Sequence, residues 1–424
     1  MNRFSRPVLF VAVVALEAAA CSAKPQETPA PQPPPTTVAP APTPSPAPLQ
    51  GEDFSSDARL MYRIVACAGT DPLPEGIDPA VVKTHCDWME PKIEAYRKLY
   101  VGVAKPFLAT LRPEGLPKAV VYPFGGGDLI SALTSYPDAA EITTISLEHG
   151  GDPRRLKSLT SDELARSLDV IRKTIKQLLT LDDSASEDLM KVQRGGIPGQ
   201  LAFFLVGLAV HGQEPVSLRY FRLEPDGSIH YLTAEDIAAS EPKRAQKLNT
   251  IWNAPDFSEA FSNLELTFRP VGKPDARPQV HRHIAANIAD GPLAKDPRLL
   301  RHLESKGRVA AMVKAAMYLL WMGDFSTMRN YLVTNADFTF SDTTGVPPRF
   351  AAKAGLVQET YGSFEGTFIP AFQGPAYQKE TDAFKDLWKS QPHRDIAFRY
   401  GYPDVNHRGH LMVTRKAAAE KAKL

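Results

Sequence analysis

The order of apolar and polar segments in this 424-residue sequence predicts an α/β fold, a sheet with helices on both faces. Three observations support the prediction. Val120–Glu148 holds an apolar run, three glycines and an aspartate, a stretch of helical spacing, and a second apolar run. Strand and helix patterns then alternate along the chain. Near the C-terminus, Ile396–Tyr400 and Leu411–Thr414 are predicted to pair as an antiparallel hairpin at the sheet edge.

The remaining elements follow from periodicity and turn residues. In Trp88–Leu111, Pro91 fits a first helical turn, and Pro106 is expected to kink or end the helix. The predicted helices are Asp57–Ala66, Trp88–Leu111, Ser161–Leu181, Ser186–Val192, Leu201–Gly212, Pro297–Glu304, Val309–Leu320, Phe325–Thr334 and Ala376–Trp388. The further predicted strands are Val216–Leu223, Ser228–Leu232, Leu264–Arg269, Val280–Ala286 and Asp337–Ser341.

The composition is that of an ordinary globular protein, with 43% hydrophobic and 23% charged residues. The formal net charge of +1 provides no field that would attract a polyanion. We therefore expect no nucleic-acid partner.

The N-terminus has the pattern of a secretion signal. Arg3 and Arg6 precede the apolar run Val8–Leu16, and three alanines lead to Cys21. This arrangement resembles the lipobox of bacterial lipoproteins, in which the signal is cleaved and the cysteine carries the lipid. An uncleaved anchor or an ordinary secretion signal is the alternative, although the run is shorter than the roughly 20 residues of a membrane span. By the same resemblance, Ser22 implies the outer membrane of a Gram-negative bacterium.

The segment after the cysteine has the composition of a spacer. Residues 24–50 contain 11 prolines in 27 positions, so they favour polyproline II and cannot bury a core. At about 3.1 Å per residue this segment reaches roughly 80 Å. The expected organisation is a signal peptide at 1–20, a lipidated Cys21 with a linker at 21–50, and a single α/β region at 51–424, held by its lipid on the membrane and located in the periplasm.

Two of the three cysteines remain once Cys21 is lipidated. Cys67 and Cys86 are an even pair in an oxidising compartment, which predicts a disulfide bond. A metal pair or two buried thiols are the alternatives, but there is no CxxC spacing that would favour a metal. The bond would stabilise the turn-rich loop between the two cysteines by about 3 kcal/mol.

The glycine loop is the first candidate for chemistry. Glycines after a strand let the backbone approach a ligand, and the next helix offers free N–H groups. Glu148 ends the following strand and could accept hydrogen bonds from a ribose. Asp342 follows a later strand and is expected at the same sheet edge as Asp128. The candidate ligand-binding residues are Gly125, Gly126, Gly127, Asp128, Glu148 and Asp342.

This layout resembles the first half of a class I methyltransferase, and the terminal hairpin resembles the edge strands of that family. Gly125 and Gly127 match a Gly-x-Gly pattern, so the resemblance implies a Rossmann-like sheet with an S-adenosylmethionine pocket over the loop. Pro123 stands where the family has an acid for the amino acid end of that cofactor. Because the cofactor is also made and held in the cytosol, we expect the chain to bind no cofactor.

Two further stretches are similar to ones in uncharacterised bacterial envelope lipoproteins. They are Tyr122–Asp128, with a Tyr-Pro-Phe-x-Gly-x-Asp pattern, and Asp342–Pro347, with an Asp-Thr-Gly-like pattern. The second is also comparable to the Asp-Thr-Gly of aspartic proteases, but it occurs once and such proteases need a second aspartate. A turn capped by Asp342 is the simpler interpretation.

The histidines provide another hypothesis. His281 and His283 alternate on one strand, so they would share a face about 7 Å apart. With His407 and His410 they could form a zinc or copper site, yet hydrogen-bonded histidines without metal are commoner, and we predict no metal.

These observations lead to two hypotheses for function. The first is an outer-membrane lipoprotein whose Rossmann-like domain binds a small ligand or an envelope component without catalysis. The second is a methyltransferase-like or other transferase that uses the pocket at the strand ends. A cleft in which Asp128, Glu148 and Asp342 converge would favour the enzyme.

Overall fold

The computed structural model of the chain describes residues 50–181, 189, 191–192, 196–240 and 258–417. Residues Leu49–Leu424 form one compact unit, separate from Met1–Pro48. The predictions for the signal, Cys21 and most of the linker lie outside the described residues, as does most of the predicted helix Ser186–Val192.

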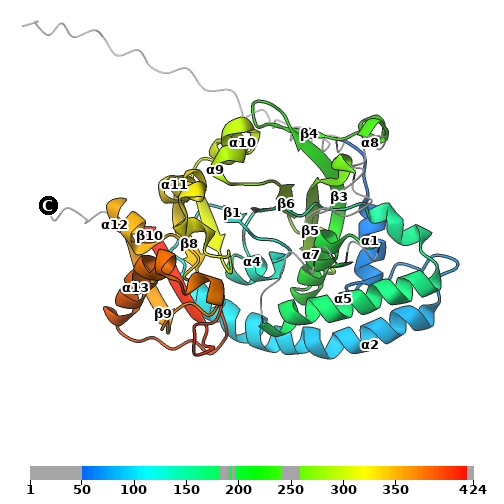
Figure 1. Cartoon of the computed structure of the whole chain (residues 1–424). Coiled ribbons are helices and arrows are strands. Elements are labelled where there is room, and N and C mark those ends of the chain that lie inside the picture. The colour runs from blue at the N-terminus through cyan, green and yellow to red at the C-terminus, as the bar shows by residue number, and fades with distance from the viewer. Residues whose placement is uncertain (1–49, 182–188, 190, 193–195, 241–257, 418–424) are drawn as a thin grey trace, which may run out of the picture. The chain divides into compact units, whose positions relative to one another are not determined.

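In the described residues, ten strands form one mixed sheet in the order β4-β3-β5-β6-β2-β1-β7-β8-β10-β9 (Figure 1). The strands are β1 Ala119–Pro123, β2 Glu141–Ser146, β3 Gln213–Leu223, β4 Ile229–Tyr231, β5 Asn263–Pro270, β6 Gln279–Ala285, β7 Val309–Val313, β8 Ala336–Ser341, β9 Leu356–Gly362 and β10 His410–Lys416. The five central strands β6, β2, β1, β7 and β8 are parallel. The flanking strands pair antiparallel at both ends. The predicted α/β class is therefore confirmed.

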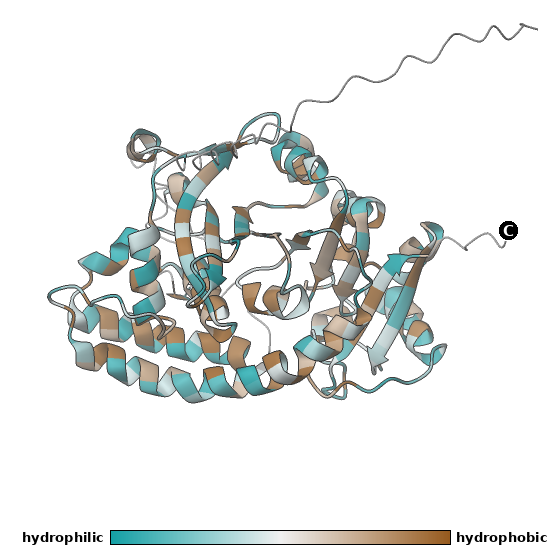
Figure 2. Cartoon of the chain, turned by 180° about the vertical axis from the view of Figure 1, so that it is seen from behind, coloured by the Kyte–Doolittle hydropathy of each residue, from teal (hydrophilic) through white to brown (hydrophobic). Residues whose placement is uncertain are grey.

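The helices are α1 Ser55–Ile64, α2 Pro79–Tyr96, α3 Lys105–Leu111, α4 Leu129–Ser135, α5 Ser161–Leu181, α7 Gly199–Val210, α8 Ala234–Ser240, α9 Asp290–Lys295, α10 Arg298–Ser305, α11 Ser326–Asn335, α12 Pro348–Lys353 and α13 Pro375–Lys389. Side chains of α1, α2, α4, α5 and α7 form one core with one face of the sheet. Helices α9 to α12 form a second core on the opposite face. In Figure 2 the outer sides of the long helices are largely hydrophilic. The result is a three-layer arrangement.

Helix α7 is the central element of the first core. Each of its residues is buried, and it is apolar on all sides, as expected for a helix enclosed between other elements. It packs against α4, α1 and β3. Gly207 lies against the backbone of Ile130 at the start of α4, where a Cβ atom would make a tight contact of 3.2 Å with the Ile130 nitrogen.

The order of strands reverses between β1 and β7. Strands β2 and β6 extend the sheet on one side of β1, and β7 and β8 extend it on the other. In open α/β sheets the carboxyl ends of the strands at this reversal are the usual place for ligands. The glycine loop follows β1 and therefore lies at this point.

Three predictions about elements are wrong. Val309–Leu320 is not a helix: Val309–Val313 is strand β7, buried throughout, and a central parallel strand has the same continuous apolar pattern as a buried helix. Ile396–Tyr400 is not a strand, and the partner of β10 is β9, which the sequence analysis did not identify. The predicted pairing of Ile396–Tyr400 with Leu411–Thr414 is therefore absent, and the antiparallel pair at this edge is β9 with β10.

The long helix before the glycine loop begins earlier than predicted. Helix α2 begins at Pro79, so Pro91 lies inside it rather than in the first turn. The helix continues through a π-helical segment, Arg97–Ala104, into α3. Pro106 has no N–H for the ordinary helical hydrogen bond, and the adjacent π-helical turns accommodate that loss without ending the helix.

Candidate functional site

The glycine loop is closed by side chains of the protein itself. A Cβ atom at Gly127 would lie 2.9 Å from Leu189 and 3.0 Å from Phe203. Phe124 and Gly126 have positive φ values, 62° and 47°, which turn the chain sharply after β1. The glycines therefore permit close packing of the loop against α7, and the space above Gly127 is apolar and filled.

Asp128 is held by three partners. Its Oδ1 accepts from the Ser131 amide at 3.3 Å and caps α4. Its Oδ2 accepts from the Tyr122 hydroxyl at 2.9 Å and from the Lys314 ammonium at 3.1 Å. The Lys314 side chain is fully buried and also donates to Ser131 Oγ at 2.6 Å. An internal cation thus neutralises the carboxylate of the loop.

Asp342 fastens three loops together. Its Oδ2 accepts from the backbone amides of Ala315 at 3.0 Å and Tyr402 at 2.9 Å, and its Oδ1 accepts from the amide of Thr344 at 2.8 Å. Gly401 passes directly over the carboxylate, because a Cβ atom there would lie 2.2 Å from Oδ2. This acid is fully buried and joins the ends of β7 and β8 to the segment before β10.

Glu148 differs from the other two acids. It is buried, with 1% of its surface exposed, and its carboxylate oxygens have no hydrogen-bond partner among the described residues. Its backbone oxygen accepts from His283 Nε2 at 2.7 Å. The predicted acids therefore do not converge on one cleft. Asp128 and Asp342 lie on the two sides of Lys314–Ala315, and Glu148 belongs to a separate group at the end of β2.

His281 and His283 share a face of β6, as predicted, and both bond to one hydroxyl. Thr144 Oγ1 lies 2.9 Å from His281 Nε2 and 3.1 Å from His283 Nδ1. Burial lowers the pKa of both rings. The other two histidines belong to another region of the sheet, where His410 bonds to Thr343 at 2.9 Å. Among the described residues, no group of three or more acidic, histidine or cysteine side chains is arranged to hold a metal ion.

The disulfide bond between Cys67 and Cys86 is present, as predicted. It joins the segment after α1 to the middle of α2. Nearby, His85 Nε2 bonds to the backbone oxygen of Val65 at 2.9 Å, and burial lowers the pKa of this ring to about 4. The disulfide bond and the His85 hydrogen bond thus join the end of α1 to α2.

An open cleft lies at the carboxyl ends of β3 and β6, beside α9 and α10. Its volume is about 570 Å³, and we call it the β3–β6 cleft. Its apolar lining consists mainly of Phe221, Leu223, Leu232, Ile284, Leu293 and Leu299. Its polar lining includes His149, Arg222, Glu259, Asn263, Asn287, Asp296 and Arg298. The cleft lies to one side of the glycine loop, because β2 separates β1 from β6, the nearest strand that lines the cleft.

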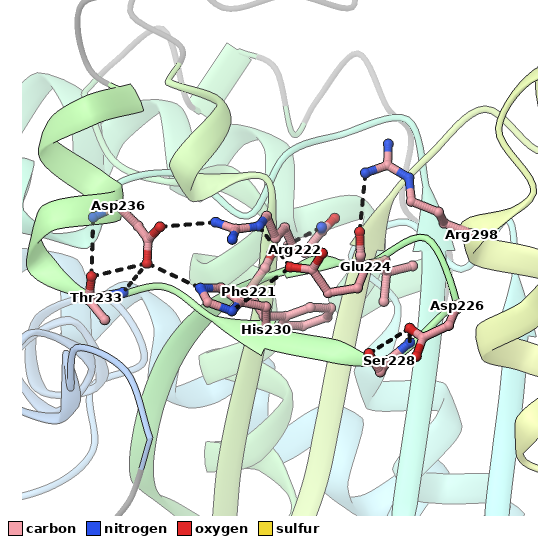
Figure 3. Close-up of polar contacts among 11 residues, drawn as sticks. Phe221, Arg222, Glu224, Asp226, Ser228, His230, Thr233, Asp236 and Arg298 are labelled. Carbon is pink, nitrogen blue, oxygen red and sulfur yellow. Dashed lines mark hydrogen bonds and ion pairs between the residues drawn. The ribbon is translucent and has the colours of Figure 1, made fainter.

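A network of ion pairs holds the rim of this cleft in place (Figure 3). Arg222 donates to Glu224 at 3.0 Å and to Asp236 at 3.0 Å. Asp236 also closes a capping box with Thr233 at the start of α8, with bonds of 3.0 Å and 3.2 Å. The Thr233 amide, followed by Arg222 and His230, lowers the pKa of Asp236. These contacts hold the Arg222 side chain in one position.

Arg298 of α10 is fixed beside the carboxyl end of β3. It donates to both oxygens of Asp296 and, at 3.1 Å, to the backbone oxygen of Leu223. Asn263 links the neighbouring strands, because its side chain donates to Phe221 O at 3.1 Å and accepts from the Ala285 amide at 3.0 Å. The walls of the cleft are thus rigid and polar, above an apolar floor.

The sequence analysis missed both Lys314 and the cleft. A single lysine in the otherwise apolar run Val309–Leu320 was the available signal for a buried cation. For the cleft, the signals were the turn Glu224–Gly227 and the capping pattern from Thr233 to Asp236, but neither indicates a cavity by itself. The cavity arises only when α9 and α10 pack beside β3.

Comparisons with protein-family models, with curated proteins and with solved structures give no match to this chain. Within the described residues, each helix is too short or too polar to cross a membrane.

Proposed function

We propose that this protein is a lipid-anchored protein of the bacterial outer membrane whose α/β region binds a small ligand without catalysing its conversion. The observation that supports a non-catalytic role is the closed glycine loop. Leu189 and Phe203 fill the space over Gly127, and Lys314 already supplies a cation to Asp128. A cofactor bound there would have to displace buried apolar side chains and break a buried ion pair.

The ligand is assigned to the β3–β6 cleft. This cleft is concave and open, it lies at the carboxyl edge of the sheet, and it combines an apolar floor with a few fixed polar groups. Two cations, Arg222 and Arg298, and two acids, Glu259 and Asp296, line it, so its formal charge is balanced. A molecule of low net charge, with an apolar body and polar groups at its ends, matches this lining.

A test is native mass spectrometry of the protein purified from its own envelope. Ala286 lines the cleft at a partly exposed position, so Ala286→Trp should fill the cleft and remove a retained small molecule. Ala352 is exposed on α12, away from the cleft lining, and Ala352→Trp is the matched control, which should keep the molecule. Equal retention by both variants, or no bound molecule in the unaltered protein, would contradict the assignment.

A methyltransferase-like enzyme is the second candidate. One observation favours it: the antiparallel strand β10 lies between β8 and the edge strand β9, an edge arrangement consistent with the resemblance to that family. The measurement that separates the two hypotheses is the thermal unfolding midpoint with and without S-adenosylmethionine. We expect no change in the midpoint, and a concentration-dependent rise would favour the enzyme.

The lipid anchor has its own test. Metabolic labelling with a fatty-acid probe should mark the wild-type protein and vanish in Cys21→Ala. Labelling that survives this substitution would exclude lipidation at this cysteine.

A further inference from the structure

The charges around the β3–β6 cleft do not cancel once the partners of its two arginines are counted. Within the lining itself, Arg222 and Arg298 equal Glu259 and Asp296 in number. Arg298 donates to both carboxylate oxygens of Asp296, so these two groups neutralise each other. The net charge of the cleft therefore depends on the other two groups, Arg222 and Glu259.

Arg222 is already neutralised by acids that lie outside the lining. Its guanidinium donates to Glu224 at 3.0 Å and to Asp236 at 3.0 Å, and Figure 3 shows the three side chains in one group. One positive charge cannot neutralise two carboxylates. This group therefore has one negative charge in excess, so Arg222 does not favour an anionic ligand.

Glu259 is the acid of the lining that has no partner. Its side chain is exposed, and its carboxylate makes no hydrogen bond or ion pair with the residues that the structure describes. The Ser262 hydroxyl donates to the backbone oxygen of Glu259 at 2.8 Å, directly after the short 3₁₀ helix Glu259–Phe261. Glu259 thus adds a second uncompensated negative charge, on a carboxylate that is free to bind a ligand.

The charged residues just outside the lining do not reverse this excess. Lys295 of α9 and Arg301 of α10 are basic, whereas Asp226 follows β3, Glu235 lies on α8, and Asp290 lies on α9. The acids outnumber the bases in this set as well. The whole chain has a formal net charge of +1, so the negative charge is a local property of the cleft.

Two histidines near the cleft do not alter the sign of its charge. Burial lowers the pKa of His149, which lines the cleft, to about 3, so this ring is neutral at pH 7. His230 Nε2 lies 3.2 Å from Asp236 Oδ2. A proton on His230 would cancel one negative charge, and the charge of Glu259 would still be uncompensated.

The apolar floor of the cleft strengthens the attraction of this charge for a cation. The six apolar side chains of the floor are each at most 7% exposed, so the charges lie beside a medium of low dielectric constant. A cleft that combines such walls with charges of one sign concentrates ions of the opposite sign. The same side chains provide a surface for a hydrocarbon body.

We propose that the ligand of the β3–β6 cleft is a cationic amphiphile, with a hydrocarbon body on the apolar floor and an ammonium group beside Glu259. This proposal rests on the proposed function, which assigns a small ligand to the cleft, and it adds the chemical class of that ligand. An ammonium group offers three donors to a carboxylate, and a single positive charge keeps the net charge of the molecule low. An anionic group would be repelled by the excess negative charge.

The test compares three probes that have the same hydrocarbon chain, namely octylamine, octanol and octanoate. The mature chain carries Cys21→Ala, so that no attached lipid and no detergent competes for the probes. Dissociation constants at pH 7 are obtained from the line broadening of each probe in NMR titrations. Ala286→Trp, which fills the cleft, identifies the part of the binding that takes place there.

We expect octylamine to bind in the cleft about fivefold more tightly than octanol, and octanoate to bind less tightly than octanol. Glu259→Gln should remove most of the difference between octylamine and octanol, and Glu259→Lys should make octanoate the tightest of the three. Raising the salt concentration should reduce the preference for octylamine. Glu90→Gln is the matched control and should keep this preference, because Glu90 is exposed on α2, which packs in the first core.

Binding of octanol as tight as that of octylamine would overturn the cationic class, while loss of that binding in Ala286→Trp would leave the assignment of a ligand to the cleft intact. If Ala286→Trp changes the binding of none of the probes, the cleft is not the site and both proposals fail. Dihexanoyl phosphatidylethanolamine carries an ammonium group close to a phosphate. Tighter binding of this probe than of octylamine would assign the cleft to a zwitterionic lipid headgroup and would also overturn the proposal.

Discussion

The ion pair between Lys314 and Asp128 allows the role of the glycine loop to be measured. The Lys314 ammonium and the Asp128 carboxylate are 3.1 Å apart, and their side chains are 0% and 6% exposed. At an effective dielectric constant of about 20, their attraction is about 5 kcal/mol. Removing either partner leaves the other charge buried, which costs about 3 to 5 kcal/mol. We therefore expect Asp128→Asn and Lys314→Met each to lower the free energy of unfolding by that amount.

The double variant distinguishes the pair from its neighbours. Asp128→Asn with Lys314→Met removes both charges, and replacement of a buried ion pair by uncharged groups is often nearly neutral. Its free energy of unfolding, from urea denaturation at pH 7 followed by circular dichroism, should exceed the additive expectation by at least about 3 kcal/mol. The exposed pair Lys83 and Asp87, 2.7 Å apart, is the control, and the corresponding cycle should show a coupling of at most about 0.5 kcal/mol.

Additive effects at the buried pair would refute this reasoning. The charges would then act independently, and the carboxylate of Asp128 would be free for another partner such as a ligand. The non-catalytic assignment of the loop would lose its electrostatic support.

Three further predictions concern stability. Burial lowers the pKa of His85 and of His302 to about 4 from an ordinary 6.5. The folded state therefore binds fewer protons than the unfolded state, and the free energy of unfolding falls as the pH falls from about 6.5 towards 4. The loss is up to about 3 kcal/mol for each ring. Urea midpoints at pH 7 and pH 5 should show this loss, His302→Gln should reduce it, and a midpoint independent of pH would contradict it. The double variant Cys67→Ala with Cys86→Ala removes the disulfide and should lower the free energy of unfolding by about 3 kcal/mol, because the bond closes a loop of sequence separation 19. An unchanged urea midpoint under non-reducing conditions would contradict this prediction. Gly401→Ala should lower the free energy of unfolding by at least about 2 kcal/mol, because the new Cβ atom would meet the Asp342 carboxylate. Gly272 has the same φ of 71° but lies in open space, so Gly272→Ala should lower it only by the backbone strain of about 1 kcal/mol. Equal losses of unfolding free energy in the two variants would disprove the steric argument.

Local patterns were sufficient to predict several elements of the sheet. Within Val120–Glu148, the two apolar runs are strands β1 and β2, and the segment of helical spacing between them is α4. These elements were predictable because strand propensity and helix capping by Asp128 depend on a few neighbouring residues. The hairpin of β3 and β4 was likewise predictable from the turn at Glu224–Gly227. The pairing of Cys67 with Cys86 followed from the count of cysteines together with the secretion signal, which assigns Cys21 to the lipid and the chain to an oxidising compartment.

Other elements could not be predicted from local patterns. Val309–Val313 is apolar throughout, and an apolar run this short fits a buried strand and a buried helix equally well. Pairing with β1 makes this segment a strand. Its side chains then alternate between the two cores on the two faces of the sheet. Strand β9 has a mixed pattern of burial, and its position at the sheet edge depends on pairing with β10, about 50 residues later.

By itself the sequence determined the α/β class, the position of the glycine loop after the first strand, and the disulfide bond, since each depends on nearby residues or on composition. Only the tertiary structure decided what the loop does. Lys314 reaches Asp128 from 186 residues away, and Phe203 of α7 fills the space above Gly127. Such long-range packing cannot be read from local patterns, and it shifts the open part of the carboxyl edge to the β3–β6 cleft.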